Sequence, residues 1–489
     1  MNNLTLPTVI VGGGFVGLFT ALHLSHRHYS EPIILIDPEE RFVFKPLLYE
    51  YLTGEMQDEQ VLPRYEELLE GSKVTFVRDR VTDIDFEQRR VKLASGLHYD
   101  YRHLVLGVGS TQGYFGTEGA KENAFPFRTQ EDAVRLEKHL QDCLQQASQR
   151  LLRRETTEPA LTVGQTEDVA KRSSLLTFVV TGAGPAGVEM AATLADLLPS
   201  WYDKLGGNIQ DIRIVIINHG TEILSGDINA HLRETALEAL KNRAVPVELL
   251  LGVKVTAVDS DSLKYQGKDK DEVETIFSKT TIWTAGTANN PLIESLGQIK
   301  PENKDKHGLP IVTSTLQLPD FPEVFAAGDC AVVKEHPYPP VAQIAYQQGA
   351  GIADNLVALS GGEEPHPVKA TMRGTLMKLG LNNGVANLFE KMQVKGMTGD
   401  LIRNATYLEL LPTPVHNFKA TTNWLTDEIF HRHHPPQTNT TSKKQSNSLA
   451  TWIGGIIAAI ALITGSIVVW RTIHPSLQPQ PTQEQGEIE

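Results

Sequence analysis

A glycine-rich motif occurs twice in this chain, each time between an apolar, strand-like run and a helical pattern. The first copy follows the run 8–11 and has the spacing Gly-x-Gly-x-x-Gly, with its fixed positions at Gly12, Gly14 and Gly17. In such a motif the first glycine permits a tight turn, the second lets the backbone approach a pyrophosphate, and the third lets the helix pack closely on the strand. The amide groups at the start of the helix then hold the phosphates.

An acidic residue at the expected distance supports the same interpretation. Asp37 ends the strand-like run 32–36, twenty residues after Gly17, where a carboxylate accepts hydrogen bonds from a ribose. The glycine spacing alone is weak, but strand, helix and spaced acid together are specific. The first motif therefore predicts a dinucleotide site.

The second copy of the motif lies in residues 178–189, with its glycines at Gly182, Gly184 and Gly187. Two such motifs in one chain imply two dinucleotides. At the end of the next strand-like run, 213–217, Asn218 stands where an acid would select NADH. An amide tolerates NADH or NADPH, and no arginine follows to demand the 2′-phosphate. We expect NADH with substantial NADPH use, and the preference stays open.

One apolar segment, 452–470, carries no charge and is about as long as a bilayer-spanning helix requires. Trp452 and Trp470 sit at its ends, where aromatic rings favour the headgroup layer. Basic residues precede the segment more than they follow it, which predicts a single-pass membrane protein with its catalytic domains on the cytoplasmic side. A buried helix of a soluble domain is the alternative.

The composition excludes several classes of protein. The 45 basic and 59 acidic residues give a net charge of −14, the wrong sign for a nucleic-acid-binding protein. The only cysteines, Cys143 and Cys330, are too far apart in sequence to suggest a dithiol centre, and Cys330 is read as a small packing residue. Residues 1–7 lack the features of a secretory signal. No metal site is expected, and the cluster 431–434 is read as a cationic patch or linker.

These patterns predict an α/β fold with two Rossmann-like dinucleotide-binding domains, the first of them discontinuous, followed by a membrane-associated region and one transmembrane helix. The expected ranges are 1–128 for the first part of the first domain, 129–288 for the second domain with a linking helix and a polar insertion, 289–384 for the second part of the first domain, 385–430 for the membrane-associated region, 431–451 for a linker, 452–470 for the transmembrane helix and 471–489 for a polar tail.

The stretch 315–329 is the most specific in the chain, and it resembles the second FAD signature of the two-dinucleotide-domain flavoproteins. Segments 99–110 and 281–287 resemble the strand-to-crossover segments of that superfamily. The resemblance implies that the first domain binds FAD, with Asp329 at the ribityl chain, and that the second binds NAD(P)H. The implied FAD residues are Gly12, Gly14, Gly17, Asp37, Lys45, Pro46, Gly109, Gly328 and Asp329, and the implied NAD(P)H residues are Gly182, Gly184, Gly187, Asn218 and Gly286.

The run 341–349, VAQIAYQQG, resembles the A-Q-x-A-x-Q-Q motif of type II NAD(P)H:quinone oxidoreductases, and segment 41–49 also looks like that family. The resemblance spans about residues 8–384 and implies a quinone site lined by Ala342, Gln343, Tyr346 and Gln347. An ordinary helix start with glutamines facing water is the alternative. Segment 372–381 resembles the branch found in photosynthetic lineages, whose quinones include plastoquinone and demethylphylloquinone.

The resemblance implies a membrane-bound, non-proton-pumping flavoprotein that passes a hydride from NAD(P)H to FAD and two electrons to a quinone. Glu189 is the candidate catalytic residue, because its family counterpart lies near the nicotinamide. Its alternative role is that of an acid favoured by the helix dipole. The expected partners are a membrane quinone and the lipid bilayer, with a homodimer as the assembly to test. A reductase of a soluble acceptor and an NAD(P)H-sensing flavoprotein are the competing functions.

Overall fold

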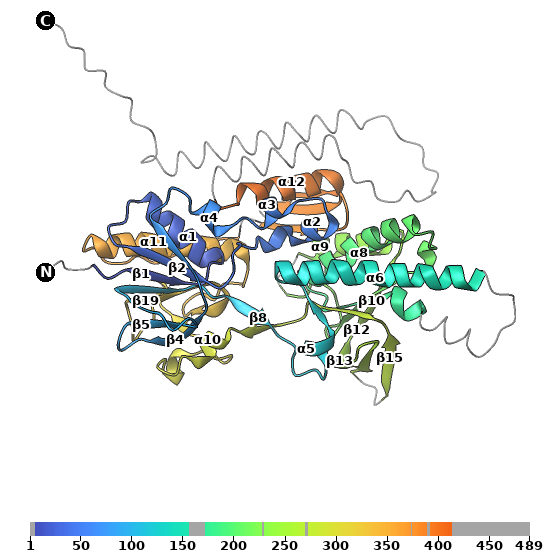
Figure 1. The fold of residues 1–489 in the computed structure, drawn as a ribbon, viewed down its shortest axis with the longest axis horizontal. Helices are drawn as coiled ribbons and strands as arrows, with labels where there is room; N and C mark the ends of the chain where they lie inside the picture. The colour runs from blue at the N-terminus through green and yellow to red at the C-terminus, as the bar shows by residue number, and fades with distance from the viewer. Residues whose placement is uncertain are drawn as a thin grey trace, which may run out of the picture.

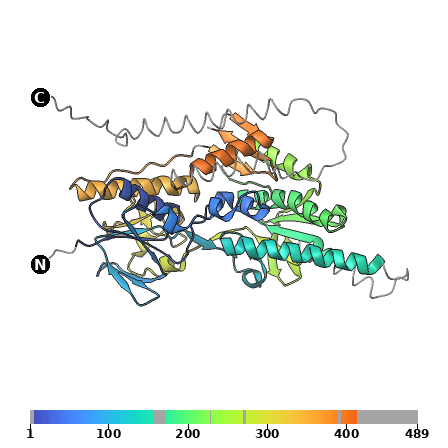
Figure 2. The ribbon, with the colours of Figure 1, turned by 45° about the horizontal axis from the view of Figure 1, so that its top comes forward.

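The computed structural model describes residues 5–155, 172–226, 229–268, 272–372, 374–388 and 392–412. They form two α/β units side by side, joined by a pair of crossover strands, with a smaller C-terminal module over the junction (Figure 1). In the turned view this module, drawn in orange, again lies above helices of both units (Figure 2). The fold thus leaves the junction between the units as the common meeting place of all three parts.

The first unit is built on a five-stranded parallel sheet in the order β19-β7-β1-β2-β3. Its strands are β1 (Thr8–Val11), β2 (Ile33–Asp37), β3 (Val74–Arg78), β7 (His103–Leu106) and β19 (Val324–Ala326). All four residues of β1 are buried, as expected of a central strand with both faces covered. Because β19 comes from a segment far along the chain and pairs with β7, the first unit is discontinuous.

Two helices of this unit cross in close contact, α1 (Phe15–His26) and α11 (Ala342–Ser360). A Cβ at Gly349 would lie only 2.5 Å from the carbonyl oxygen of Val16, and Thr20 donates a 3.0 Å hydrogen bond to the carbonyl of Gly349. The quinone-motif helix is therefore held directly against the helix of the first glycine motif.

The rest of the first unit is made of short elements. They are α2 (Leu48–Thr53), α3 (Asp58–Val61), α4 (Tyr65–Leu68), α10 (Pro291–Ser295), the antiparallel strands β4 (Val81–Asp85), β5 (Arg90–Leu93) and β6 (His98–Asp100), the pair β18 (Ile311–Val312) and β20 (Val332–Val333), and single 3₁₀ turns at Lys45–Leu47, Pro301–Asn303 and Gly328–Cys330.

The second unit repeats the parallel-sheet plan in the order β12-β11-β10-β16-β9. Its sheet and helices are β9 (Phe125–Pro126), β10 (Thr177–Thr181), β11 (Arg213–Asn218), β12 (Val247–Leu251), β16 (Thr280–Trp283), α5 (Ala120–Asn123), α6 (Gln130–Glu155), α8 (Pro185–Lys204), the 3₁₀ turn Ile209–Asp211 and α9 (Ala230–Lys241). An antiparallel meander covers one side, with β13 (Val253–Val258), β14 (Ser262–Gly267) and β15 (Val273–Phe277). Residues 156–171 of the expected polar insertion lie outside the described residues.

The chain passes between the units twice, through β8 (Ser110–Gln112) and β17 (Thr287–Asn289), which pair antiparallel. A Cβ at Gly113 would lie 2.9 Å from the carbonyl carbon of Thr287, so the two passages are in direct backbone contact. Because β9 and α5 join the second unit, the chain enters that unit near Gly113, earlier than the expected boundary at residue 128.

The C-terminal module consists of β21 (Gly374–Lys378), β22 (Gly384–Leu388), β23 (Met392–Lys395) and α12 (Gly396–Glu409). The expected boundary at residue 384 falls inside the β21–β22 hairpin. These strands are only four or five residues long, so their sequence carries little periodicity. Residues 413–489, with the expected linker, transmembrane helix and tail, lie outside the described residues. Among the described residues, no helix combines the length and apolar character of a membrane span.

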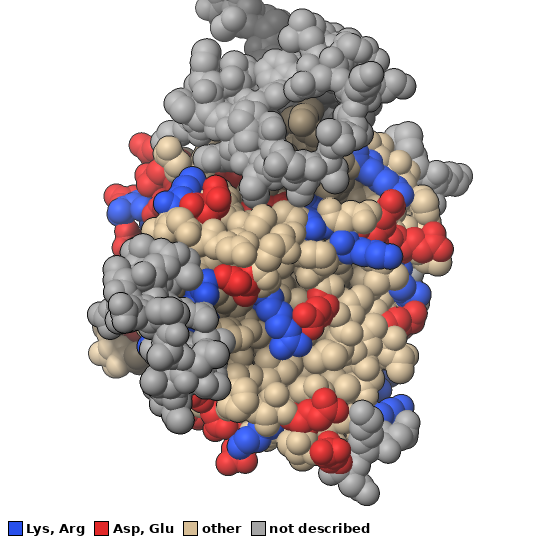
Figure 3. Space-filling model, turned by 90° about the vertical axis from the view of Figure 1, so that its right-hand side faces the viewer, with Lys and Arg blue, Asp and Glu red and all other residues tan. Residues whose placement is uncertain are grey.

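On the face of the second unit shown in Figure 3, basic and acidic side chains are intermixed among uncharged residues. Elsewhere in the second unit, Arg213 and Glu248 form an exposed ion pair at 2.7 Å across β11 and β12. The charges on this face are therefore a solvated surface of mixed sign.

Candidate functional site

The first glycine motif forms the tight strand-to-helix turn that its spacing predicts. Gly12 has a positive φ of 96°, and a Cβ there would lie 2.7 Å from the carbonyl oxygen of Gly107. A Cβ at Gly17 would collide with the carbonyl oxygen of Gly12. Gly14 caps α1, whose first amides point out of the turn. Only glycine fits at positions 12 and 17, whereas a Cβ at Gly14 would meet the carbonyl oxygen of Gly107 at an ordinary 3.8 Å. The cradle fits a dinucleotide pyrophosphate.

Asp37 lies at the end of β2, beside this cradle. Its carboxylate accepts hydrogen bonds from the backbone N–H of Gly13 at 2.6 Å and of Glu39 at 2.9 Å. Burial raises the pKa of Asp37 above its ordinary value, and the two amides counteract this. The position and the remaining acceptor capacity of the carboxylate fit the ribose contact that the sequence predicts.

Asp329 projects from the 3₁₀ turn after β19 and accepts a 2.8 Å hydrogen bond from the hydroxyl of Ser110. Arg128 donates to the hydroxyl and to the carbonyl oxygen of Ser110, at 2.9 Å and 3.0 Å. Burial and the nearby Arg128 lower the pKa of Lys45 to about 8, although Asp329 counteracts them. Two cations and one carboxylate thus surround the start of β8.

Other residues expected at the FAD site have defined positions. Gly328 donates its N–H to the side-chain oxygen of Gln348 at 2.8 Å, which ties the Asp329 turn to α11. Gly109 has a positive φ of 63° at the end of the β7 connection. Pro46 accepts a 2.6 Å hydrogen bond from Arg403 through its carbonyl oxygen. A pocket between the Asp329 turn and α11 is lined by Asp329, Val333, Tyr338, Val341, Ala345 and Gln348.

The second glycine motif repeats the first. Gly182 has a φ of 105°, Gly184 caps α8, and a Cβ at Gly187 would collide with the carbonyl oxygen of Gly182. A Cβ at Gly182 would lie 3.0 Å from the backbone of Ala285, so the end of β16 lies beside this cradle. Gly286 follows with a φ of 73°.

Asn218 ends β11, the strand next to β10. Its side-chain oxygen accepts a 3.2 Å hydrogen bond from the backbone N–H of Ala183, and its amide donates to the carbonyl of Gly220 at 3.2 Å. The amide group thus lies against the glycine motif, where the ribose of a bound dinucleotide would be read.

Glu189 lies on the first turns of α8 and faces the C-terminal module. Its carboxylate accepts a 2.8 Å hydrogen bond from the backbone N–H of Lys378. Burial raises the pKa of Glu189 to about 7, and Arg403 and the amide of Lys378 counteract it. Tyr49 of α2 donates a 3.1 Å hydrogen bond to the carbonyl of Ala186, one turn before Glu189. Glu189 is therefore a carboxyl that titrates near neutral pH where all three parts of the fold meet.

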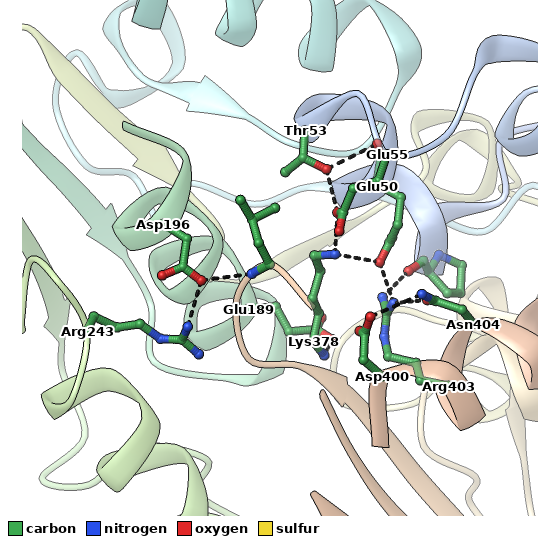
Figure 4. Close-up of polar contacts among 12 residues, drawn as sticks. Glu50, Thr53, Glu55, Glu189, Asp196, Arg243, Lys378, Asp400, Arg403 and Asn404 are labelled. Atoms are coloured by element: carbon green, nitrogen blue, oxygen red, sulfur yellow. Dashed lines mark hydrogen bonds and ion pairs between the residues drawn. The ribbon is translucent and has the colours of Figure 1, made fainter. Parts of the chain in front are cut away.

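Beside Glu189 lies a buried cluster of charges, drawn in Figure 4. The ammonium of Lys378 contacts Glu50 at 3.0 Å and Glu55 at 2.6 Å, and Arg403 contacts the same oxygen of Glu50 at 2.5 Å. Although burial works to raise it, Arg403 and Lys378 hold the pKa of Glu50 below its ordinary value. Burial raises the pKa of Asp400, on α12 in the same cluster, to about 7.

A second contact joins the C-terminal module to the second unit. Asp196 of α8 accepts hydrogen bonds from Arg243 at 2.6 Å and from the backbone N–H of Leu381 at 2.8 Å (Figure 4). The charge cluster and this contact escaped the sequence analysis, because their members lie far apart in the chain. One feature of the sequence could have indicated the cluster, because Glu50 is a charged residue within the otherwise uncharged, largely apolar run 47–52.

The quinone-motif residues lie on the first turns of α11. Gln343 donates to the carbonyl of Gly374 at 3.0 Å, and Gln347 exchanges two hydrogen bonds with the backbone of Thr371, at 3.0 Å and 3.1 Å. Tyr346 packs its ring 5.6 Å from that of Phe19. Ala342 begins the helix. The two glutamine amides therefore hold the strand that leads into the C-terminal module, a role that the motif did not predict.

Both cysteines are buried and free. Burial raises the pKa of each thiol to about 11, and the thiol of Cys330 donates to the carbonyl of Ala327 at 3.1 Å. Each is protonated at neutral pH, and they lie in different units, so they form no dithiol centre.

The pattern of the pyridine nucleotide-disulphide oxidoreductase family matches residues 6–349. The alternative NAD(P)H-ubiquinone oxidoreductase C1 of Arabidopsis thaliana is 31% identical over 450 residues, which cover 85% of this chain and 79% of that protein. The demethylphylloquinone reductase NdbB of Synechocystis is 32% identical over 432 residues, 85% of this chain and 95% of that protein. The structure of NDH2 from Plasmodium falciparum in complex with NADH has a similar fold, with a TM-score of 0.74 at 19% identity over 88% of this chain and 99% of that one.

Proposed function

This chain belongs to the pyridine nucleotide-disulphide oxidoreductase family and, within it, to the type II NAD(P)H:quinone oxidoreductases, and we propose from that membership how its residues divide the reaction. The protein is an FAD-dependent enzyme that takes a hydride from NAD(P)H and passes two electrons to a quinone. Its α/β fold is that of pyridine nucleotide oxidoreductases.

The proposal that the two units share one hydride-transfer reaction rests on the short strand β8, which contacts both candidate nucleotide sites. Ser110 at its start bonds to Asp329 of the first unit, and Gln112 at its end donates at 3.0 Å to the carbonyls of both Ala285 and Gly286 in the second. Two residues of extended strand span about 7 Å. Nucleotides bound at the two sites therefore approach closely enough for their reactive rings to meet across the junction.

The first unit is proposed to hold FAD. The helix start after Gly14 holds the pyrophosphate, Asp37 accepts from the adenosine ribose, and Asp329 accepts from the ribityl chain. Gly12, Gly17, Gly109 and Gly328 shape the turns, and Lys45 and Pro46 line the site beyond Asp329. Bound there, FAD supplies acceptance of a hydride and delivery of two electrons.

The second unit is proposed to hold NAD(P)H, with Gly182, Gly184 and Gly187 at the pyrophosphate and Asn218 at the adenosine ribose. Gly286 lies on the nicotinamide side. Glu189 handles a proton, or orients the nicotinamide amide, because a carboxyl with a pKa of about 7 is present in both protonation states at neutral pH. Positioning by these residues provides most of the rate, since hydride transfer requires contact between the rings.

The quinone is proposed to bind beside the first turns of α11, near Ala342, Gln343, Tyr346 and Gln347. A plastoquinone or naphthoquinone type is proposed, in keeping with the similarity to a demethylphylloquinone reductase. We further propose that the enzyme is a single-pass membrane protein through residues 452–470, with its catalytic units on the cytoplasmic side. Assembly as a homodimer belongs to the same proposal.

The test uses the full chain purified in detergent. Bound FAD is measured by its absorbance, and oxidation of NADH and NADPH is followed with plastoquinone, naphthoquinone and benzoquinone analogues and with oxidised ferredoxin. Turnover with quinones but not with ferredoxin is expected. Turnover with ferredoxin alone would favour a soluble-acceptor reductase, and flavin reduction without turnover on any acceptor would favour a sensor.

A further inference from the structure

Phe115 is the most exposed large apolar side chain of the described residues, with 73% of its surface accessible. It lies in the turn 114–117, where the N–H of Thr117 donates to the carbonyl of Tyr114 at 2.9 Å. The two central residues, Phe115 and Gly116, have φ values of 52° and 67°. Positive φ at both central positions is typical of a type I′ turn, which prefers asparagine, aspartate or glycine.

An aromatic residue in this conformation is strained, and its ring gains little burial in return. Strained, exposed residues of this kind persist mainly at functional sites, so the conformation of Phe115 suggests that the residue has a function. The surrounding backbone holds the turn in place. The indole N–H of Trp283 donates to the carbonyl of Gly113 at 2.9 Å, and Gln112 donates to the carbonyls of Ala285 and Gly286.

The distal edge of the Phe115 ring lies against Gly286. A Cβ at Gly286 would collide with the ring atoms Cζ and Cε2, and it would lie 3.2 Å from Cε1. Gly286 follows the carboxyl end of β16, next to the glycine cradle of the second unit. The exposed ring is therefore fixed at the rim of the NAD(P)H site.

The strand order decides which half of NAD(P)H this rim faces. Asn218, at the end of β11, marks the adenosine ribose, and β11 and β16 flank β10 on opposite sides. A dinucleotide whose pyrophosphate rests on the β10 turn extends its other half over the end of β16. The rim formed by Gly286 and Phe115 thus faces the nicotinamide riboside.

We propose that Phe115 is a positioning residue for NAD(P)H, whose exposed ring packs against the nicotinamide riboside and holds it toward the flavin. This inference rests on the proposed function of the second unit. The glycine at 286 leaves room for the distal edge of the ring, and the strained turn fixes the ring before the substrate arrives.

The test compares Phe115→Asn with Phe115→Tyr in the full-length, FAD-loaded protein. Asparagine suits the turn but removes the ring, whereas tyrosine keeps the ring. Anaerobic stopped-flow reduction of the flavin by NADH, without quinone, gives the Kd and the limiting rate. For Phe115→Asn we expect a roughly tenfold higher Kd, as for loss of one base-stacking ring, together with an unchanged or higher Tm. Phe115→Tyr should bind NADH like the wild type.

Phe277→Ala is the matched control, because Phe277 is also an exposed phenylalanine of the second unit, at 68%, but lies on the edge strand β15. Its Kd should not change. A second readout is quenching of flavin fluorescence by NAD⁺, which requires no turnover. A wild-type Kd for Phe115→Asn, or equal effects of Phe115→Asn and Phe277→Ala, would overturn the proposal. Absence of FAD, or of reduction by NADH in every variant including the wild type, would instead refute the proposed function.

Discussion

The backbone N–H of Lys378 donates a 2.8 Å hydrogen bond to the carboxylate of Glu189, and the ammonium of the same lysine contacts Glu50 and Glu55. One residue of the C-terminal module thus touches a carboxyl at the proposed NAD(P)H site and two carboxylates of the first unit. The protonation state of Glu189 is therefore coupled, through Lys378, to the packing of the C-terminal module on the first unit.

Replacing Glu189 with glutamine should stabilise the protein at alkaline pH. The raised pKa of Glu189 means that the folded state disfavours its ionised form. The free energy of unfolding of the wild type therefore falls as pH rises from about 4.5 to about 7, and the cost persists above that range. Glu189→Gln should be more stable by at most about 3 kcal/mol at pH 8 and unchanged near pH 4, as measured by urea unfolding. An equal effect at both pH values would contradict this account.

The same variant tests catalysis. If Glu189 handles a proton, flavin reduction by NADH in the wild type should change with an apparent pKa of about 7, and this dependence should vanish in Glu189→Gln. A structural acid at a helix start would leave the pH profile of the reduction rate unchanged. Stopped-flow reduction across pH 5–9 distinguishes the two.

Replacing Glu50 with alanine should strongly destabilise the fold, because Lys378 and Arg403 would lose the oxygen that they share while remaining buried. Removing one partner of a buried ion cluster costs about 3–5 kcal/mol. Urea unfolding at pH 7 measures the loss. Lys92→Met is the control, because its ion pair with Asp83 is exposed, and no measurable change is expected there. Similar stabilities of the two variants would show that the cluster contributes nothing.

Replacing Asn218 with aspartate should shift the enzyme toward NADH. A carboxylate at this position repels a 2′-phosphate and accepts from a ribose hydroxyl, so kcat/KM for NADPH should fall roughly tenfold or more relative to NADH. Steady-state kinetics with a quinone analogue give the ratio. Asn242→Asp, at an exposed helix end of the same unit, should leave it unchanged. A preserved ratio in Asn218→Asp would place the ribose elsewhere.

Replacing Gln347 with alanine should raise the KM for quinone, with the reduction of the flavin by NADH left intact. The side chain of Gln347 holds the backbone of Thr371 beside the proposed quinone site. Without its two hydrogen bonds, that segment is no longer fixed in place. The KM for a quinone analogue is expected to rise roughly tenfold, the loss of about 1.4 kcal/mol of binding. Gln141→Ala, on the exposed face of α6, is the control. Unchanged quinone kinetics would favour the reading of the motif as an ordinary helix start.

Residues whose role depends on local geometry could be predicted from the sequence. The turn at Gly12 and Gly17 follows from spacing alone, because a Cβ at Gly17 meets an oxygen only five residues away. The discontinuous first unit followed from the return to short strand-like runs, turns and a helix start in residues 289–351. The resemblance to a known family then separated the two dinucleotides, which spacing could not do.

Residues that depend on distant partners could not be predicted in this way. Lys378 and Glu50 are separated by 328 positions, and no local pattern brings a lysine and a glutamate from such segments together. The same holds for Phe115, because its proposed role depends on its contact with Gly286, far along the chain. A phenylalanine before a glycine in a loop does not by itself indicate a strained backbone. The C-terminal hairpin was missed because its strands are too short to establish an alternation.

The paired crossover strands have a consequence for recombination between relatives. The chain leaves the first unit at Gln112 and returns at Thr287, and these two residues are direct neighbours in the β8–β17 register. Everything between them can be regarded as a cassette whose two ends are already adjacent. Exchanging that cassette for the matching segment of another enzyme requires no new loop. Its contacts with the rest of the chain must be matched as well, among them those of Arg128 with Ser110, Ala186 with Tyr49, Glu189 with Lys378 and Asp196 with Leu381.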